Sequence, residues 1–172
     1  MKTKHVLLVD GYNMIGDWPE LQELKQLSLV QARVRLIERM KEYEAHTKWK
    51  IIIVFDAHLQ RGKEKRELDG RVEVIYTRQH ETADEKIERL SQELKSRTTQ
   101  IYVATSDSVE QWVIFGQGAL RKSAREMQLE LEQMDRAVTK RVEEMKVYTP
   151  VTKIPMSDEV AETLERWRRG LK

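Results

Sequence analysis

Four short apolar runs along the chain predict β-strands. Val6–Val9 and Ile51–Phe55 are continuous and rich in branched residues, and Val72–Tyr76 and Ile101–Ala104 are weaker runs of the same kind. Apolar runs without polar alternation are typical of strands that are covered on both faces, as they are in a parallel sheet.

Helical periodicity occupies the segments between these runs. Apolar residues recur at steps of three and four in two sets, namely Leu24, Leu27, Val30, Val34, Ile37 and Met40, and then Ile87, Leu90 and Leu94. Capping-box spacing marks helix starts at Thr82 with Glu85, Asp107 with Glu110, and Ser123 with Glu126. Strands that alternate with helices predict an α/β fold in three layers, with a central, mostly parallel sheet of four or five strands.

A long amphipathic helix is predicted after Ser123. Its apolar stripe, which we interpret as core packing against the sheet, comprises Met127, Leu131, Met134, Val138, Val142 and Met145. Two prolines then bracket an extended connector, and Asp158–Arg169 is predicted as a short basic helix. We expect one domain over residues 1–147, with residues 148–172 packed on or beside it. Trp167 is interpreted as a packing anchor, with stacking on a base as the alternative.

The composition excludes several classes of protein. The 172 residues include no Cys, which excludes disulfide scaffolds, thiolate-bound zinc or iron–sulfur centres and a Cys nucleophile. No apolar run approaches the ~20 residues of a membrane span, and the N-terminus lacks a signal-peptide pattern. We expect a cytoplasmic protein with no membrane partner. Its 31 basic and 29 acidic residues nearly cancel, so the positions of the charges say more than their sum.

Acidic residues follow the predicted strands. Asp10, Asp56 and Asp107 come at or just after the ends of three apolar runs, and Glu81 and Asp84 follow the remaining one. Ligands of open α/β sheets bind outside the carboxyl ends of the strands, so these side chains are expected at one edge. Like charges that gather there are costly unless they share protons or bind a cation. Oxygen donors without Cys or paired His select Mg²⁺ or Mn²⁺ over Zn²⁺. The alternative for each Asp is a helix cap or a turn.

The first of these acids opens the segment Asp10-Gly11-Tyr12-Asn13. Gly11 would permit a tight turn beside the carboxylate. Asn13 could orient Asp10 or a water molecule by hydrogen bonding, or could be an ordinary turn residue.

Four motifs in order carry a resemblance to a known family. They are Leu7–Asn13, Val54–His58, Glu81–Asp84 and Ala104–Asp107. Together they resemble the YacP-like NYN domain family of the PIN-like nuclease group, which includes a bacterial ribosome-associated endoribonuclease that initiates mRNA decay. The resemblance implies a PIN-like fold over residues 1–147 and a divalent-metal site that hydrolyses RNA phosphodiester bonds.

The resemblance also implies roles for individual residues. Asp10 and Asp84 match the principal metal-binding carboxylates, Asp107 matches a further ligand or water-positioning acid, and Asn13 matches the Asn beside the first Asp. Supporting positions are Asp56, Glu81 and Ser106. The hypothesis is in-line attack of a metal-activated water on phosphorus, which leaves a 5′-phosphate and a 3′-hydroxyl, and no His is required.

Basic residues near this edge are candidates for binding RNA, because an acidic centre alone repels a polyanion. We predict contacts from two segments: Arg61, Lys63, Lys65 and Arg66 in the first, and Arg121, Lys122 and Arg125 in the second. The first segment also contains acidic residues, so an ordinary solvated loop is the alternative.

Two other functions remain open from the sequence. One is a non-catalytic RNA- or ribosome-binding adaptor that keeps an acidic magnesium site. The other is a phosphatase, which is disfavoured because an Asp-x-Asp pattern is absent after the first strand, where Gly11 and Tyr12 follow Asp10. The chain lacks a Gly-x-Gly-x-x-Gly fingerprint and a phosphate-binding P-loop, so no nucleotide cofactor is expected. The sequence leaves the oligomeric state, the cleavage motif and the number of metal ions undetermined.

Overall fold

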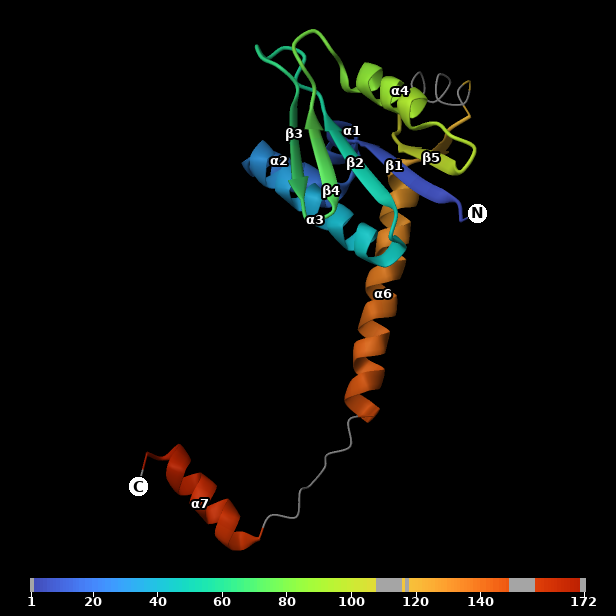
Figure 1. The fold of residues 1–172 in the computed structure, drawn as a ribbon. Helices are drawn as coiled ribbons and strands as arrows, with labels where there is room; N and C mark the ends of the chain where they lie inside the picture. The colour runs from blue at the N-terminus through green and yellow to red at the C-terminus, as the bar shows by residue number, and fades with distance from the viewer. Residues whose placement is uncertain (1, 108–115, 117, 149–156, 171–172) are drawn as a thin grey trace. The chain divides into compact units, whose positions relative to one another are not determined.

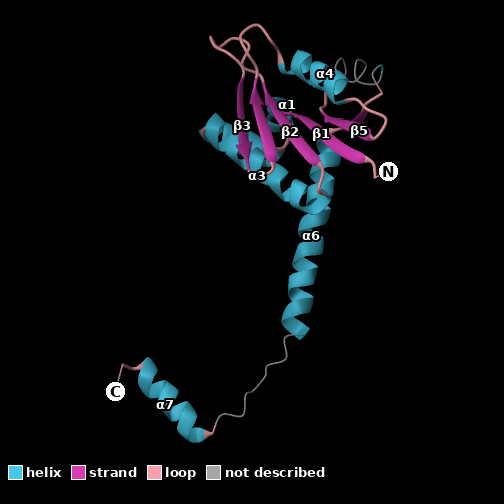
Figure 2. Ribbon diagram, viewed as in Figure 1, coloured by secondary structure: helices cyan, strands magenta, loops and turns pink. Residues whose placement is uncertain are grey.

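The computed structural model describes residues 2–107, 116, 118–148 and 157–170, in two parts that comprise residues 1–135 and 136–172. The first part holds a six-stranded sheet made of β1 (Lys4–Asp10), β2 (Lys50–Phe55), β3 (Lys65–Asp69), β4 (Val72–Tyr76), β5 (Thr99–Ala104) and β6 (Leu120–Lys122). The described helices are α1 (Gly11–Asp17), α2 (Pro19–Leu27), α3 (Leu29–Thr47), α4 (Ala83–Leu94), α6 (Ala124–Tyr148) and α7 (Asp158–Arg168). Figures 1 and 2 show these elements.

The strand order is β3-β4-β2-β1-β5-β6. Among the described strand pairs, β3 and β4 are antiparallel and the other four pairs are parallel. This confirms the α/β class and the mostly parallel sheet. The predicted number of four or five strands is too low, because two strands carry no apolar run. All five residues of β3 are exposed, and β6 is only three residues long. Pairing with a neighbouring strand, rather than apolar periodicity, defines both of them.

Helices cover both faces of the sheet, as the three-layer prediction requires. Leu7 and Val9 of β1 face a core that includes residues of α1, α2, α3 and the first turns of α6. Val6 and Leu8 face the opposite core, to which α4 contributes Ile87. Successive strand residues point to opposite faces, so one continuous apolar run serves both layers.

Two of the predicted helix starts are confirmed by their caps. The hydroxyl of Thr82 accepts the N–H of Glu85 at 3.2 Å, and the Glu85 carboxylate accepts the N–H of Thr82 at 3.0 Å. Ser123 and Glu126 form the same reciprocal pair at the start of α6, at 3.1 and 2.6 Å. The third predicted start depends on Glu110, which lies outside the described residues.

The apolar stripe of α6 is divided between the two parts of the chain. Met127 and Leu131 are buried and Met134 is partly buried against the same core, as predicted. Val138 and Val142 belong to the second part and are 56% and 46% exposed. The packing of the later residues against the sheet stays a prediction. A 25-residue helix is about 37 Å long, roughly twice the length of these strands.

The second part contains the end of α6 and the helix α7. The predicted terminal helix is present and begins at Asp158, with Ser157 at the N-cap position. Within this part Trp167 is 69% exposed, and its packing against residues 1–147 stays a prediction. A search of the described helices finds no segment long and apolar enough to cross a membrane.

Candidate active site

The order of the strands creates a topological switch point at β1. This strand lies between β2 and β5, and the chain extends the sheet first on the β2 side and later on the β5 side. Asp10 is the last residue of β1, and Asp107 follows β5 by three residues. Ligands of open α/β sheets bind outside the carboxyl ends of strands at such a point, so the topology places both acids where a binding site is expected.

Asp10 is the buried member of this acidic group. It is 8% exposed and caps α1, with its Oδ1 accepting the N–H of Asn13 at 3.4 Å. The pKa of Asp10 is raised from 3.8 to about 6, chiefly by burial and also by the charges of three other carboxylates, against the lowering effect of the Asn13 N–H. These carboxylates belong to Asp84, Asp56 and Asp107. The four carboxylates therefore act on one another, although they come from four separate segments.

Asn13 connects the segment after β1 to the segment after β5. Its side-chain Oδ1 accepts the N–H of Ser106 at 2.8 Å. The Ser106 hydroxyl in turn accepts the N–H of Ala124 at 3.4 Å, and the Thr105 hydroxyl accepts the N–H of Asp107 at 3.1 Å. The backbone N–H of Asn13 thus bonds to Asp10, whereas its side chain holds Ser106, the residue before Asp107. A role of the Asn13 side chain in orienting Asp10 or a water molecule stays a prediction.

Replacing Asn13 by Ala is expected to lower the free energy of unfolding by about 1 kcal/mol, because Ser106 N–H loses its protein acceptor. Urea unfolding measures the change. The exposed Gln26 offers a matched control, and Gln26→Ala is expected to shift stability by less than about 0.5 kcal/mol. Equal effects of the two substitutions would show that the Asn13 tether contributes nothing.

Asp56 fixes the start of α4. Its Oδ2 accepts the N–H of Ala83 at 3.4 Å, and its Oδ1 accepts the N–H of His58 at 3.0 Å and contacts the His58 ring Nδ1. Burial opposes ionisation, but these hydrogen bonds prevail and hold the pKa of Asp56 below its ordinary value. Because Asp84 is the residue after Ala83, Asp56 positions the exposed Asp84 carboxylate at the edge of the sheet.

Glu81 has a different environment from the four aspartates. It is 5% exposed, and its Oε1 accepts a hydrogen bond from the Arg89 guanidinium, while its Oε2 lies 3.6 Å from Nε of Arg78. The ion pair with Arg89 links Glu81 to α4, and the pair with Arg78 links it to the segment after β4. Both arginines hold the Glu81 side chain within the fold. The supporting role in the site that the resemblance implies for Glu81 stays a prediction.

The chemistry of the donors fits a hard divalent cation. Carboxylate oxygens that repel one another gain from a cation, and Mg²⁺ typically keeps several waters while it binds one or two carboxylates. Within the described ranges, no group of three or more His and acidic side chains is already arranged around a common point. The arrangement is thus an open acidic site, in which Asp10, Asp84 and Asp107 could serve as ligands.

Three of the predicted RNA-binding cations line a cleft beside the acidic site. Arg61, Lys63 and Lys65 surround a volume of about 360 Å³ that Asp56 also lines. The structure adds Arg33 to this cleft, together with two tyrosines, Tyr12 and Tyr76. The sequence patterns did not mark Arg33, and they included Tyr12 and Tyr76 only within a motif and a predicted strand. The three residues become neighbours only in the fold, because they belong to a helix, a helix start and a strand.

The remaining predicted cations lie elsewhere. Arg66 forms ion pairs with Glu64 at 2.6 Å and Glu73 at 3.3 Å, and it alternates along β3 with Lys65. Lys122 is bonded to Glu130, and its Nζ lies 5.3 Å from the centre of the Trp49 ring. The structure thus gives Arg66 and Lys122 partners within the protein.

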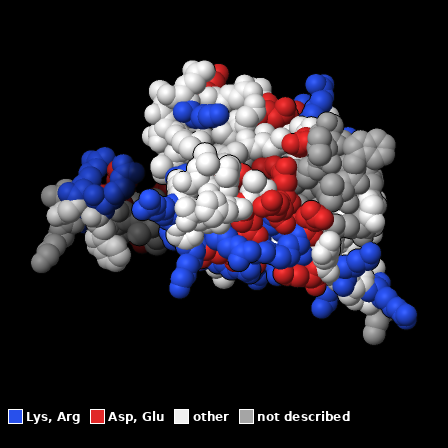
Figure 3. All heavy atoms as spheres, turned by 90° about the horizontal axis from the view of Figure 1, so that it is seen from above, with Lys and Arg blue, Asp and Glu red and all other residues white. Residues whose placement is uncertain are grey.

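Arg121 and Arg125 are exposed at β6 and at the start of α6. They are therefore accessible to a ligand. Seen from above, acidic side chains gather in the middle of the visible face, and lysines and arginines lie directly beside them (Figure 3). An acidic centre with adjacent cations suits a polyanion whose reacting phosphate must approach carboxylates.

Comparison with known proteins places this geometry in a family. The YacP-like NYN domain model matches residues 7–169. The uncharacterized protein YacP of Bacillus subtilis (strain 168) is 55% identical over 165 residues, which cover 96% of this chain and 97% of that protein. A crystal structure of Rae1 (YacP) from Bacillus subtilis has a TM-score of 0.72 and 55% identity, covering 96% of this chain and 95% of that one. A mutant of the same protein gives a TM-score of 0.75 at 49% identity, with 99% and 96% coverage. The chain therefore belongs to the YacP-like NYN domain family, a PIN-like family of nuclease type.

Proposed function

We propose that the protein is a divalent-metal-dependent endoribonuclease that cleaves mRNA in association with the ribosome and thereby starts mRNA decay. The observation that supports this most strongly is the field of Asp84, Asp56 and Asp107 on the buried Asp10 carboxylate, at the switch point of a nuclease-type fold. Such a concentration of negative charge is costly for a structural site and useful for binding a cation.

Each residue has a role in this proposal. Asp10, Asp84 and Asp107 hold the cation, while Asp56 positions Asp84 and Asn13 positions the segment before Asp107. A bound Mg²⁺ or Mn²⁺ would supply positive charge at the reacting phosphate and lower the pKa of the attacking water. Neighbouring cations hold the RNA backbone, and no His is needed for proton transfer.

The ribosome part of the proposal rests on the family resemblance. Arg121 and Arg125 are exposed at β6 and at the start of α6, and they are the candidates for such contacts. Co-sedimentation of the protein with ribosomes in rising salt tests this part separately from catalysis. If the protein fails to co-sediment with ribosomes even at low salt, ribosome association is wrong and the proposal reduces to a nuclease that acts on free RNA.

Cleavage of a translated mRNA by wild type and by Asp84→Asn tests the catalytic part. We expect the variant to cut at least about 100-fold more slowly, because loss of a group that only positions a metal ligand already costs about 10- to 100-fold. Asp17→Asn is the matched control, since Asp17 is an exposed carboxylate at the far end of α1 and the same charge is removed.

Three results would count against the proposal. Undiminished cleavage by Asp84→Asn would remove that carboxylate from the reaction. Equal cleavage in Mg²⁺ and in EDTA would show that the reaction needs no divalent cation. Binding of RNA or ribosomes by wild type without any cleavage would identify the protein as an adaptor that retains an acidic site.

A further inference from the structure

The cleft beside the acidic site contains cations that have no carboxylate partner among the described residues. Arg33, Arg61 and Lys63 all line it, and none of them forms an ion pair within the described ranges. The other two arginines of α3 behave differently, because Arg35 lies 2.5 Å from Glu20 and Arg39 lies 3.0 Å from Asp135. Positive charge that the fold leaves uncompensated in a cleft favours an anionic ligand.

Arg33 is held in place within this cleft. It is half-buried, its Nη1 donates a hydrogen bond to the Tyr12 hydroxyl at 3.0 Å, and its Cζ lies 5.9 Å from the centre of the Tyr76 ring. Tyr12 and Tyr76 are themselves packed against Phe55, with ring centres 5.1 and 5.5 Å from it. A guanidinium has five N–H donors, and the Tyr12 hydroxyl accepts one of them. The others can bind a phosphate.

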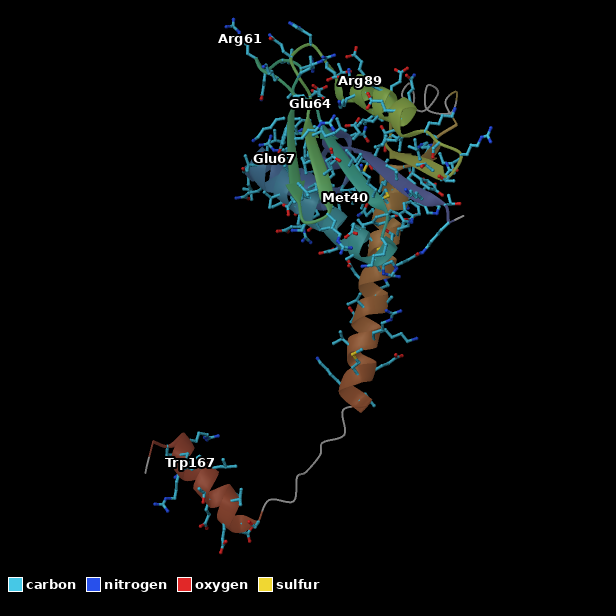
Figure 4. The ribbon with its side chains drawn as sticks, in the orientation of Figure 1. Met40, Arg61, Glu64, Glu67, Arg89 and Trp167 are labelled. Carbon is cyan, nitrogen blue, oxygen red and sulfur yellow. The ribbon has the colours of Figure 1, made fainter. Side chains whose placement is uncertain are left out.

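The loop that carries the other cations is anchored on both sides. The carbonyl of Gly62 accepts the N–H of Gln79 at 3.1 Å, and Glu64 lies 2.6 Å from the buried Lys86 of α4. Gly62 has a φ of +145°, a conformation that L side chains rarely adopt. Arg61 lies near the tip of this loop, above Glu64 (Figure 4). Lys63, between the two anchors, is therefore presented to the cleft by a supported segment.

The size and position of the cleft restrict the kind of ligand that it can hold. Its volume of about 360 Å³ falls at the lower end of small-molecule sites, which suits a single nucleotide unit. Gln60 and Thr77 add polar groups to the lining, and Asp56 belongs both to the cleft and to the acidic group around Asp10. A chain that reacts at the carboxylates would therefore place a neighbouring unit in this cleft.

We propose that this cleft binds a backbone phosphate of the RNA substrate, one or more nucleotides away from the bond that is cleaved, with Arg33 and Lys63 as its ligands. The proposal deepens the nuclease function and rests on it for the identity of the substrate. Tyr12 acts as a positioning residue that orients the Arg33 guanidinium. The site therefore determines how the RNA is placed across the carboxylates, while the reacting groups lie elsewhere.

Binding of a 5′-labelled oligoribonucleotide, measured by fluorescence anisotropy without metal, tests the proposal. All measurements use the full chain carrying Asp84→Asn, so that the probe stays intact. Adding Arg33→Gln is expected to weaken binding at least 10-fold and to reduce the salt slope of log K by about 0.7, the contribution of one phosphate contact on a single strand. Arg35→Gln is the matched control, since it removes the same charge from α3 outside the cleft, and it is expected to leave affinity within about twofold.

Further measurements distinguish the phosphate from the base and exclude misfolding. Lys63→Gln changes an exposed side chain and is expected to weaken binding in the same way. Adenosine 5′-monophosphate should compete with the probe, whereas adenosine should not. Equal behaviour of Arg33→Gln and Arg35→Gln, or equal competition by the two small molecules, would overturn the proposal.

The outcome is separable from the outcome of the nuclease test. If wild type fails to cleave RNA with metal, the proposed reaction is wrong, yet the difference between Arg33→Gln and Arg35→Gln still decides whether the cleft binds phosphate. If wild type cleaves RNA but those two variants bind alike, the nuclease function stands without this subsite.

Discussion

Replacing Asp10 by Asn is expected to stabilise the protein at pH 7 while it eliminates cleavage of RNA. Burial and the neighbouring aspartates raise the pKa of Asp10 from 3.8 to about 6 in the folded protein. At pH 7 the carboxylate is ionised in both states, so the folded state bears an unfavourable charge. A difference of that size corresponds to at most about 3 kcal/mol of the free energy of unfolding.

The sign of the pH dependence follows from proton binding. Between pH 3.8 and about 6 the folded state holds the Asp10 proton more tightly than the unfolded state does. The contribution of this group to stability is therefore complete below pH 3.8 and is lost as the pH rises through about 6. Wild type and Asp10→Asn should accordingly differ little near pH 4 and most at pH 7.

Urea unfolding of both proteins at several pH values measures this difference. The Asn side chain retains an oxygen for the Asn13 N–H, so the cap of α1 is kept. Asp17→Asn, at an exposed carboxylate of the same helix, should change stability by less than about 0.5 kcal/mol at any of these pH values. A variant that is less stable at pH 7, or a difference that does not vary with pH, would contradict the prediction.

A divalent cation should stabilise wild type at pH 7, as the Asp10→Asn substitution does. If Asp10 belongs to a cation site, Mg²⁺ at pH 7 will raise the melting temperature of wild type by mass action and will raise that of Asp10→Asn less. This measurement requires no RNA, so it tests the cation site even when the substrate is unknown.

The proximity of the aspartates could be predicted from the sequence because chain topology alone decides where these residues lie. Asp10, Asp56 and Asp107 follow apolar runs, and parallel strands bring their carboxyl ends to one edge whatever the details of packing. Glu81 followed the same rule and yet pairs with Arg89, because the side-chain direction of a loop residue depends on which partners surround it.

The basic side of the site was harder to predict for the same reason. Whether a cation is free for a ligand depends on the carboxylates that the fold brings near it, and these are remote in sequence. Lys122 forms an ion pair with Glu130 and lies over the Trp49 ring. Arg33, in contrast, donates a hydrogen bond to the Tyr12 hydroxyl. Strand β3 was missed similarly, because its charged residues form a strand only by pairing with β4.

The structure gives a different reason for glycine at position 11 from the one that the sequence suggested. A tight turn was expected at this glycine, but Gly11 is the first residue of α1 and has no positive φ. Its importance lies in close packing, because a methyl group at this position would lie 2.5 Å from Cδ1 and 3.0 Å from Cζ of Phe55. The Phe55 ring is fully buried between Tyr12 and Tyr76 and has little room to move.

Gly11→Ala is therefore expected to lower the free energy of unfolding by about 1–3 kcal/mol, the usual cost of overpacking a filled core. The loss should appear although Ala is the better helix former, a preference worth about 1 kcal/mol. Displacement of Phe55 would also move Tyr12, so phosphate binding in the adjacent cleft should weaken. Urea unfolding and oligoribonucleotide anisotropy measure the two effects.

The helix itself supplies the control for this prediction. A methyl group at Gly16, in the same helix, would meet nothing within 4 Å, so Gly16→Ala should leave stability unchanged or raise it by up to about 1 kcal/mol. Combining Gly11→Ala with Phe55→Leu creates space for the methyl group, and the double variant should lose less than the sum of the two single losses. Additive losses would show that the clash with Phe55 is not what demands glycine beside Asp10.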